Sequence, residues 1–247
     1  MGNWKANREK DRERSQFDNK FEVLKLKCVT AAGGTPIAED AKVARIRFIT
    51  DAADAESMWV HAIPKRTRLG KMFSTDYYCL AQDNLECPYC SNLNKDISKV
   101  KRKLLFKVYV YYVLHVSNNA EKSWEQVDYF GTKMFKEQVN AVRFLYQGPG
   151  FNNSVENKFL NWEKRFKTLT DRDYEWTREG FTMSETVYDL VPDDAGKSPV
   201  SDEVKTVMDA SPSLQEFIDN MKPSAGQTGT VEETEADIEK QVDDMFK

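Results

Sequence analysis

The sequence predicts a protein that is mainly β with some α, most simply a largely antiparallel barrel with one or two helices. Stretches in which apolar and polar residues alternate, as in half-buried strands, outnumber stretches with helical spacing. Strands do not alternate with helices, so a parallel sheet is not expected. The chain has 247 residues, 40% of them hydrophobic and 12% aromatic, which is enough to bury a core.

The ordered core is expected to begin near residue 20. Residues 1–19 mix basic and acidic side chains with few apolar ones, which predicts a flexible N-terminal arm. In residues 21–29 leucines alternate with lysines, which predicts a strand, and the turn-rich residues 31–40 follow. Alternation with arginines predicts a second strand over residues 43–50. Two shorter strands are predicted at residues 58–63 and 124–131.

Residues 106–116, FKVYVYYVLHV, form the clearest predicted strand because Val and Tyr dominate them. Strict alternation divides this strand between two faces. One face would carry Phe106, Val108, Val110, Tyr112 and Leu114. The other would carry Lys107, Tyr109, Tyr111, Val113 and His115. The lysine must reach water, so we expect the second face to be the one that meets a ligand.

The chain after residue 131 is expected to contain the helices. Apolar residues at helical spacing predict a helix over residues 132–147, with Thr132 as its N-cap and Gly148-Pro149-Gly150 ending it. Residues 164–181 are expected to form a strand, a turn and a strand, and residues 201–222 a helical segment.

Charge is distributed unevenly along the chain. The net charge is −4, but residues 231–247 hold seven acids and two lysines, a net of −5. Between His61 and Lys107 there are ten Lys or Arg against four acids, a net of +6. The acidic whole-chain balance therefore does not exclude a nucleic-acid partner. Such a basic block is also common as an ordinary solvated face.

Other features narrow the class of protein. The sequence has no run approaching the ~20 apolar residues of a membrane span, and its N-terminus lacks the apolar stretch of a signal peptide. Four cysteines without an export signal favour a reducing compartment. Only two histidines are present, which excludes mechanisms that need several imidazoles and leaves few groups for acid–base chemistry.

The tetrapeptide Cys87-Pro88-Tyr89-Cys90 is the most informative motif. Its two thiolates have the spacing to bind one tetrahedral zinc ion. Cys79, eight residues before Cys87, and His61, eighteen before Cys79, would complete a closed structural site. The loop around these cysteines is polar and short of core residues, so a metal would give it order.

Three other interpretations of the cysteines compete with a zinc site. The first is that the thiols are unligated, as those of a lone CxxC often are, and Cys28 is expected to be a small buried hydrophobe. Cys-Pro-Tyr-Cys is also a redox motif, so a thiol–disulfide oxidoreductase using Cys87 and Cys90 is the alternative function. A zinc deaminase is excluded, because His61-Ala62-Ile63 lacks the required glutamate and proline does not precede Cys87.

Basic residues interleaved with aromatics flank the cysteine loop. Lysine and arginine side chains bind the phosphate backbone, and aromatic rings stack on unpaired bases. The pattern therefore predicts binding of single-stranded nucleic acid. A barrel core would account for about half of these aromatics. The candidate contacts from this pattern are Lys65, Arg66, Arg68, Lys71, Tyr77, Tyr78, Lys101, Arg102, Lys103, Phe106, Lys107, Tyr109 and Tyr129.

The order of these motifs resembles the helix-destabilising single-stranded DNA-binding protein of T4-type bacteriophages, over roughly residues 20–190. The shared features are FEVLKLK, ARIRFIT, His61, the basic segment, Cys79, CPYC, VKRK, the aromatic strand, DYFGTKMFKEQVNAV and KFLN. The resemblance implies an OB-fold-like antiparallel barrel with an inserted zinc-binding subdomain, at about residues 58–103, and a disordered acidic C-terminal tail. It also adds Arg47 as a cleft arginine, and it assigns Arg102 and Lys103 to a basic cluster and Phe106 to a stacking position.

The resemblance further implies a non-enzymatic protein that coats single-stranded DNA in replication, recombination and repair, in the cytoplasm of an infected bacterial host. One structural zinc ion and self-association on DNA would accompany this role. The core would span residues 20–222, followed by a linker at 223–230 and the acidic tail at 231–247. The tail would bind partner proteins, since its apolar residues recur at helical spacing. The partner-binding residues would be Ile238, Val242, Asp243, Asp244 and Phe246.

Overall fold

The computed structural model describes residues 21–26, 28–30, 36–39, 41–66, 72–118, 123–150, 152, 154–180 and 185–223. The chain divides into two compact units, each treated by itself below. The sheet unit comprises Met1–Ser57 and Leu104–Leu214. The cysteine unit comprises Met58–Lys103 and Gln215–Lys247. The predicted arm, linker and acidic tail lie outside the described residues, except for residue 223.

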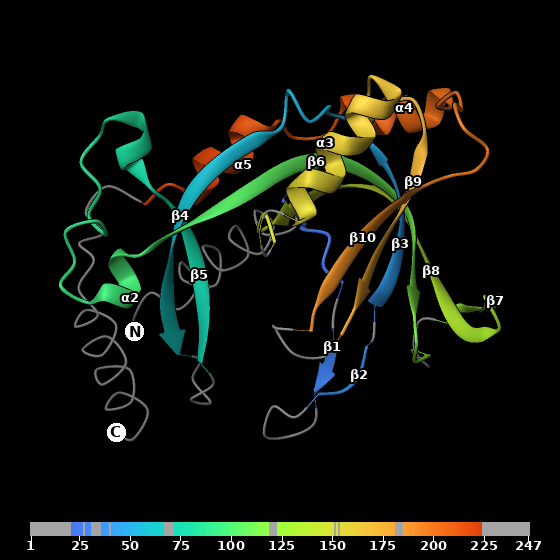
Figure 1. Cartoon of the computed structure of the whole chain (residues 1–247), viewed down its shortest axis with the longest axis horizontal. Helices are drawn as coiled ribbons and strands as arrows, with labels where there is room; N and C mark the ends of the chain where they lie inside the picture. Colours follow the sequence, from blue (N-terminus) through green and yellow to red (C-terminus); the bar gives the residue numbers. More distant parts are fainter. Residues whose placement is uncertain are drawn as a thin grey trace, which may run out of the picture. The chain divides into compact units, whose positions relative to one another are not determined.

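Antiparallel strands dominate the fold, as predicted (Figure 1). Eight of them form one sheet, in which six follow the order β10-β9-β3-β6-β4-β5 while β8 pairs with β6 and β7; β1 and β2 form a separate pair. The strands are β1 (Cys28–Thr30), β2 (Pro36–Glu39), β3 (Ala41–Phe48), β4 (Glu56–Arg66), β5 (Met72–Tyr78), β6 (Val100–His115), β7 (Glu125–Tyr129), β8 (Thr132–Gln147), β9 (Asp173–Glu179) and β10 (Val187–Pro192).

The predicted barrel is wrong for the described part of the chain. The pairing order has free ends, so the sheet is open. Alternation of apolar and polar residues is the same in an open and in a closed sheet, because both bury one face of each strand. The sequence pattern therefore predicted the strands but could not predict closure.

The segment predicted as a helix, residues 132–147, is strand β8. It pairs with β7 near its start and with β6 over most of its length, from His115↔Phe135 to Leu104↔Gln147. Its fully buried side chains are Met134, Phe144 and Leu145. Pairing with β7 at its start and then with β6 supplies backbone hydrogen bonds along the strand, and this tertiary context overrides the local helical pattern.

A β-bulge at Tyr111 changes the two faces of β6. Val110 and Tyr112 have partners in both β3 and β8, whereas Tyr111 between them has none in either register. The core cluster accordingly contains Val108 and Val110 before the bulge but Val113 after it. The predicted assignment of faces is therefore correct before Tyr111 and reversed after it, because one extra residue shifts the alternation by one.

One large cluster forms the core of the sheet unit. Phe48 lies at its centre, with ring centroids of Phe106, Phe159 and Tyr174 at 5.5, 5.8 and 5.4 Å. The predicted strand at residues 43–50 is confirmed as β3, and the apolar residues that alternate with its arginines, Ala44, Ile46 and Phe48, all belong to this cluster. Trp176 of β9 packs against Phe159 at 5.7 Å.

Helices are short and few in the described residues. They are α2 (Lys95–Ser98), α3 (Ser154–Phe166), α4 (Asp202–Asp209) and α5 (Leu214–Met221), with a 3₁₀ turn η1 (Leu80–Asp83). The predicted helical segment at 201–222 is confirmed as α4 and α5, which Pro212 separates. Helix α3 replaces the strand predicted to begin at residue 164, while the second strand of that prediction is β9. None of these helices is long and apolar enough to cross a membrane.

Candidate metal centre and nucleic-acid interface

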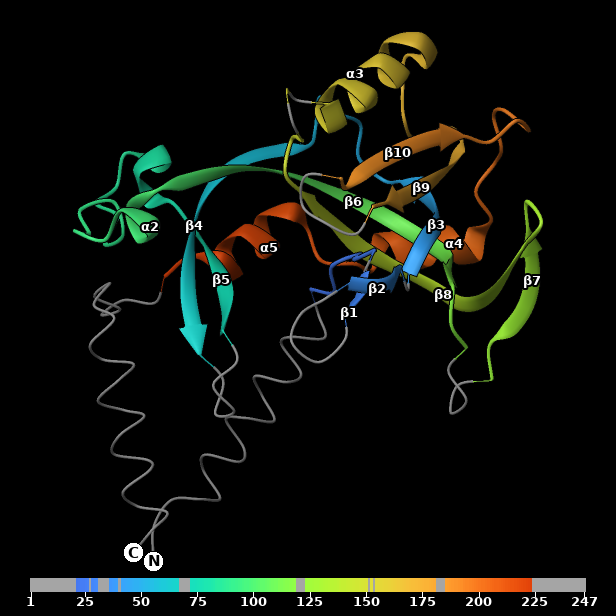
Figure 2. The same ribbon diagram turned by 60° about the horizontal axis from the view of Figure 1, so that its bottom comes forward.

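Strands β4 and β5 form a hairpin (Figure 2). This hairpin brings His61 and Cys79 together. His61 lies in β4 opposite Tyr77, and Cys79 directly follows β5. The Cys79 amide donates to the carbonyl of Trp59 at 2.9 Å, which extends the ladder by one residue. Cys87 and Cys90 come from the turns between η1 and α2, so one hairpin and one loop supply all four donors.

The four donor atoms form a compact cluster. They all lie within 4.8 Å of one another. The Sγ atoms of Cys79 and Cys90 are 3.5 Å apart, and His61 Nε2 is 3.5 Å from the Sγ atoms of both Cys87 and Cys90. A tetrahedral zinc ion with Zn–S bonds of about 2.3 Å and a Zn–N bond of about 2.0 Å has edges of roughly 3.5–3.8 Å. The residues predicted as metal ligands therefore could hold a metal ion, and their spacing fits a small tetrahedral one.

The orientation of His61 also suits a ligand. Its Nδ1 lies 2.9 Å from the carbonyl oxygen of Ile97, which can only accept a hydrogen bond. Nδ1 therefore carries the proton, and in the neutral ring Nε2 presents its lone pair to the sulfur atoms. Metal-binding histidines are usually held in this way by a second partner. The ring is fully buried, so it cannot turn away into solvent.

The thiols differ in their surroundings. Burial opposes ionisation of Cys87, but hydrogen bonds from backbone amides hold the pKa of its thiol below the ordinary value. Desolvation and the neighbouring thiols of Cys79 and Cys87 raise the pKa of Cys90 to about 12. A bound cation would deprotonate both, because metal coordination outweighs such local effects.

A small apolar cluster surrounds the donors. Tyr89 and Ile97 are buried beside Cys79 and Cys87, and Ile63, Tyr77, Leu80 and Val100 pack against them. The ring of Tyr89 lies 5.3 Å from that of Tyr77 and 5.6 Å from that of His61. Tyr77, predicted as a DNA contact, is thus half-buried in the wall of the donor site.

The predicted basic contacts of the cysteine unit lie at the start of β6 and on the β4–β5 hairpin. Lys101 is exposed, Arg102 is half-buried, and Lys103 lies 3.6 Å from the carboxylate of Asp76. Lys65 and Arg66 end β4, but their side chains lie outside the described part. Arg68 and Lys71 lie outside the described residues.

Arg47 is a buried structural residue here and does not face solvent. It is 2% exposed, and its Nε donates to Asp173 at 2.6 Å. Its Nη1 donates to the carbonyl oxygens of Thr170 and Ser198, at 3.1 and 3.0 Å. The predicted cleft role of Arg47 would require this network to open.

Several predicted aromatic contacts are also covered. Phe106 is 3% exposed and lies in the core cluster, while Tyr109 and Tyr78 are 4% and 8% exposed. Tyr129 is half-buried, and its hydroxyl donates to Glu175 at 2.9 Å. Lys107 is half-buried. We therefore do not retain Phe106 or Tyr109 as stacking residues, because their rings pack against protein.

Sequence reasoning missed the contribution of the C-terminal helix to the cysteine unit. Lys222, directly after α5, lies 3.8 Å from Asp83 and 5.5 Å from the ring centroid of Tyr78. Lys222 is about 140 positions from both Asp83 and Tyr78 in the sequence, so no local pattern relates it to them. The described part of the chain consequently ends in the cysteine unit.

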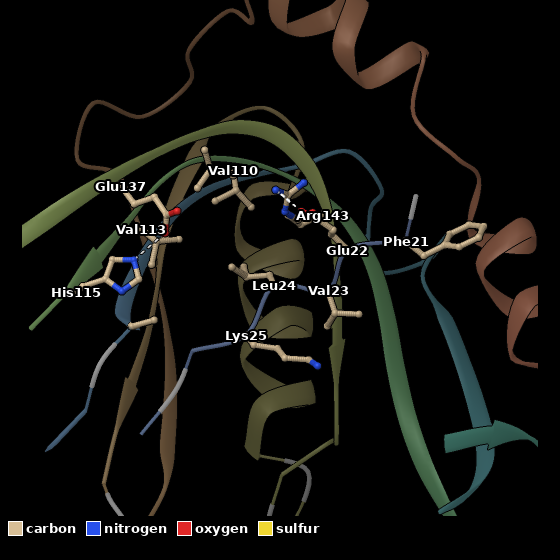
Figure 3. Close-up of a pocket in the computed structure, with 12 residues that line it drawn as sticks. Phe21, Glu22, Val23, Leu24, Lys25, Val110, Val113, His115, Glu137 and Arg143 are labelled. Atoms are coloured by element: carbon tan, nitrogen blue, oxygen red, sulfur yellow. Dashed lines mark hydrogen bonds and ion pairs between the residues drawn. The ribbon is translucent and has the colours of Figure 1, made fainter. Parts of the chain in front are cut away.

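The sheet unit contains a cavity of about 480 Å³ (Figure 3). His115 and Glu137 face each other across 2.9 Å in its wall, and Arg143 forms an ion pair with Glu22. Val113 and His115, from the face of β6 that was predicted to meet a ligand, line the cavity, whereas the residues predicted as individual metal ligands or DNA contacts do not.

Comparison of the chain with protein-family models, with curated proteins and with solved structures found no match.

Proposed function

We propose that the protein binds single-stranded DNA without enzymatic activity and that a structural zinc ion holds its binding surface. One observation carries the proposal. A four-donor metal cluster and a strongly basic segment occur in the same unit, whose residues 58–103 hold nine Lys or Arg against four acids, a net of +5.

The donor set supports zinc as the metal. Three sulfur donors and one imidazole in a small tetrahedral arrangement are typical of structural zinc sites. Four protein ligands leave no coordination position for a substrate, so the ion would act in folding rather than in catalysis. Bound zinc would fix the positions of the β4–β5 hairpin, the cysteine loop and the start of β6 relative to one another.

The basic segment supports a phosphate backbone as the ligand. Exposed Lys101 and half-buried Arg102 lie on an extended strand that leaves the donor site. Lysines and arginines bind phosphates independently of sequence, which suits a protein that coats DNA. The motif order shared with the T4-type phage proteins points to the same function. The acidic tail, residues 231–247, remains a proposed docking segment for replication and recombination proteins.

The alternative, a thiol–disulfide oxidoreductase, has less support. Such an enzyme needs an accessible first thiol at the N-terminus of a helix. Cys87 is 5% exposed and lies in a turn, and the next helix begins only at Lys95. The His61 imidazole beside both thiols suits a metal site better than disulfide exchange.

Two measurements on the intact protein test the proposal. Metal analysis of protein purified under reducing conditions should find one zinc ion per chain. Titration with a dT oligonucleotide should show tighter binding than titration with a duplex. For each neutralised phosphate, the binding constant should fall by about 0.7 log units per tenfold increase in salt concentration. Equal affinity for both DNA forms, or binding that salt does not change, would contradict DNA coating.

A further inference from the structure

The tip of the β7–β8 hairpin has an unusual composition. Tyr129 pairs with Thr132, so the connecting loop has only two residues, Phe130 and Gly131. Their φ angles are 50° and 77°. Two positive φ angles are typical of type I′ turns, which favour Asn-Gly or Asp-Gly.

Phenylalanine is a poor choice for this position in two respects. A bulky side chain at positive φ is strained. The ring of Phe130 is also 89% exposed, so it contributes little to the core. An asparagine would fit the turn better and would not expose an apolar ring, which indicates that the ring serves a purpose other than folding.

The neighbouring residues hold this ring in place. Tyr129 contacts it edge to face, with ring centroids 4.7 Å apart and an interplanar angle of 78°. Tyr129 is in turn anchored on β9, because its hydroxyl donates to Glu175 at 2.9 Å. The Gly131 amide donates to the Asp128 carboxylate at 3.0 Å, which fixes the loop. The ring is therefore presented to solvent in a defined position.

We propose that Phe130 stacks on an unpaired base of bound single-stranded DNA, an inference that rests on the proposed function. Exposed polar residues surround the tip on both strands, namely Glu125, Gln126, Asp128, Thr132 and Lys133. A protein partner would need a wider apolar patch to bury, whereas a base needs one ring face and a nearby cation for its phosphate. Lys133 is the cation nearest to Phe130 in the sequence; it lies opposite Asp128 in the hairpin, and its Nζ is 5.5 Å from the ring centroid of Phe135.

Substitution of Phe130 in the full-length protein separates stacking from folding. Phe130→Asn should raise the thermal unfolding midpoint, because it creates an Asn-Gly turn. The same substitution should weaken binding of a dT oligonucleotide by about 5- to 160-fold, which corresponds to a stacking free energy of roughly 1–3 kcal/mol. The salt dependence of binding should not change, because no cation is removed. Phe130→Trp should bind at least as tightly as the wild type.

Two controls define how the inference fails. Leu160→Asn removes another exposed apolar residue of the sheet unit and should leave the affinity unchanged. If the wild type binds the oligonucleotide but Phe130→Asn binds equally well, stacking by Phe130 is wrong while the proposed function stands. If the wild type does not bind, both are wrong. Loss of self-association without loss of DNA affinity in Phe130→Asn would assign the ring to a protein pocket and overturn the inference.

Discussion

The two units of this protein are stabilised in different ways. In the described residues, the main cluster of the sheet unit contains eighteen buried residues, including Phe48, Phe159 and Trp176. The cluster around the donors of the cysteine unit contains four, and two of those are Cys79 and Cys87. A cluster this small buries little apolar surface, so we predict that a metal ion bound by the four donors would add to its stability.

Their charged residues differ as well. In the sheet unit Arg45 pairs with Asp173 and Asp193, Arg47 with Asp173, and Arg172 with Asp171. In the cysteine unit Lys101 is exposed to solvent. The sheet unit uses these arginines to join its own strands and loops, whereas in the cysteine unit Lys103 pairs with Asp76 and Lys222 with Asp83. We propose that phosphate binding belongs mainly to the basic segment of the cysteine unit.

Removal of the metal should have the largest effect and should separate the two units. Chelation, or Cys87→Ser, should abolish hydrogen-exchange protection in the cysteine unit, because structural zinc contributes on the order of 10 kcal/mol to folding. Protection of β3 and β9 in the sheet unit should persist. Cys28→Ser, which changes the cysteine outside the donor group, is the control. Equal loss of protection in both units would contradict this separation.

Phe106→Ala should destabilise the sheet unit by about 3–5 kcal/mol, because the ring is 3% exposed and packs against Phe48 and Phe159. Denaturant unfolding measures this loss. A direct stacking role would instead lower DNA affinity without lowering stability. Phe130→Ala is the matched control, since its exposed ring should contribute little to the free energy of unfolding.

Asp173→Asn should lower the free energy of unfolding by up to roughly 3–5 kcal/mol, because it leaves the buried guanidinium of Arg47 without its carboxylate. Asp189→Asn is the matched control. Asp189 pairs with Lys158 at the surface, where such a pair contributes about 0–1 kcal/mol. Similar losses for the two variants would show that the Arg47 network is not structural.

A change of pH is expected to have a smaller effect on the stability of the sheet unit. Hydrogen bonding to Arg172 lowers the pKa of Asp171. Burial opposes ionisation of Asp193, but hydrogen bonding to Arg45 holds its pKa below the ordinary value. Both carboxylates have a lower pKa in the folded than in the unfolded state, so their contribution is present above about pH 4 and is lost as pH falls through the folded pKa values.

Hydrogen exchange of β3 and β9 as a function of pH measures this change in the sheet unit alone. Protection should decline below about pH 4, and Asp193→Asn should decline less steeply over the same range. A decline that is equally steep in the variant would exclude the Arg45–Asp193 pair as a cause.

The sequence predicted local features better than long-range ones. The four donors were found from spacing alone, because their chemistry restricts which residues can serve. The strand β3 followed from alternation. The strand β8 was missed, since its pairing partners lie elsewhere in the chain and override its helical pattern. The bulge at Tyr111 and the burial of Arg47 were missed for the same reason, because both depend on long-range contacts. The bulge lies where β6 pairs with β3 and β8, and Arg47 is buried against residues near Ser198.

The most direct test of the central claim is the dependence of DNA binding on the metal. Affinity for a dT oligonucleotide should be measured with intact, chelated and zinc-restored protein, together with a Lys101→Ala, Arg102→Ala variant. We predict that chelation abolishes tight binding, that zinc restores it, and that the double variant lowers the salt slope by about 1.4, two contacts at roughly 0.7 each. Unchanged affinity after chelation, with the cysteine unit shown to be unprotected, would contradict the account.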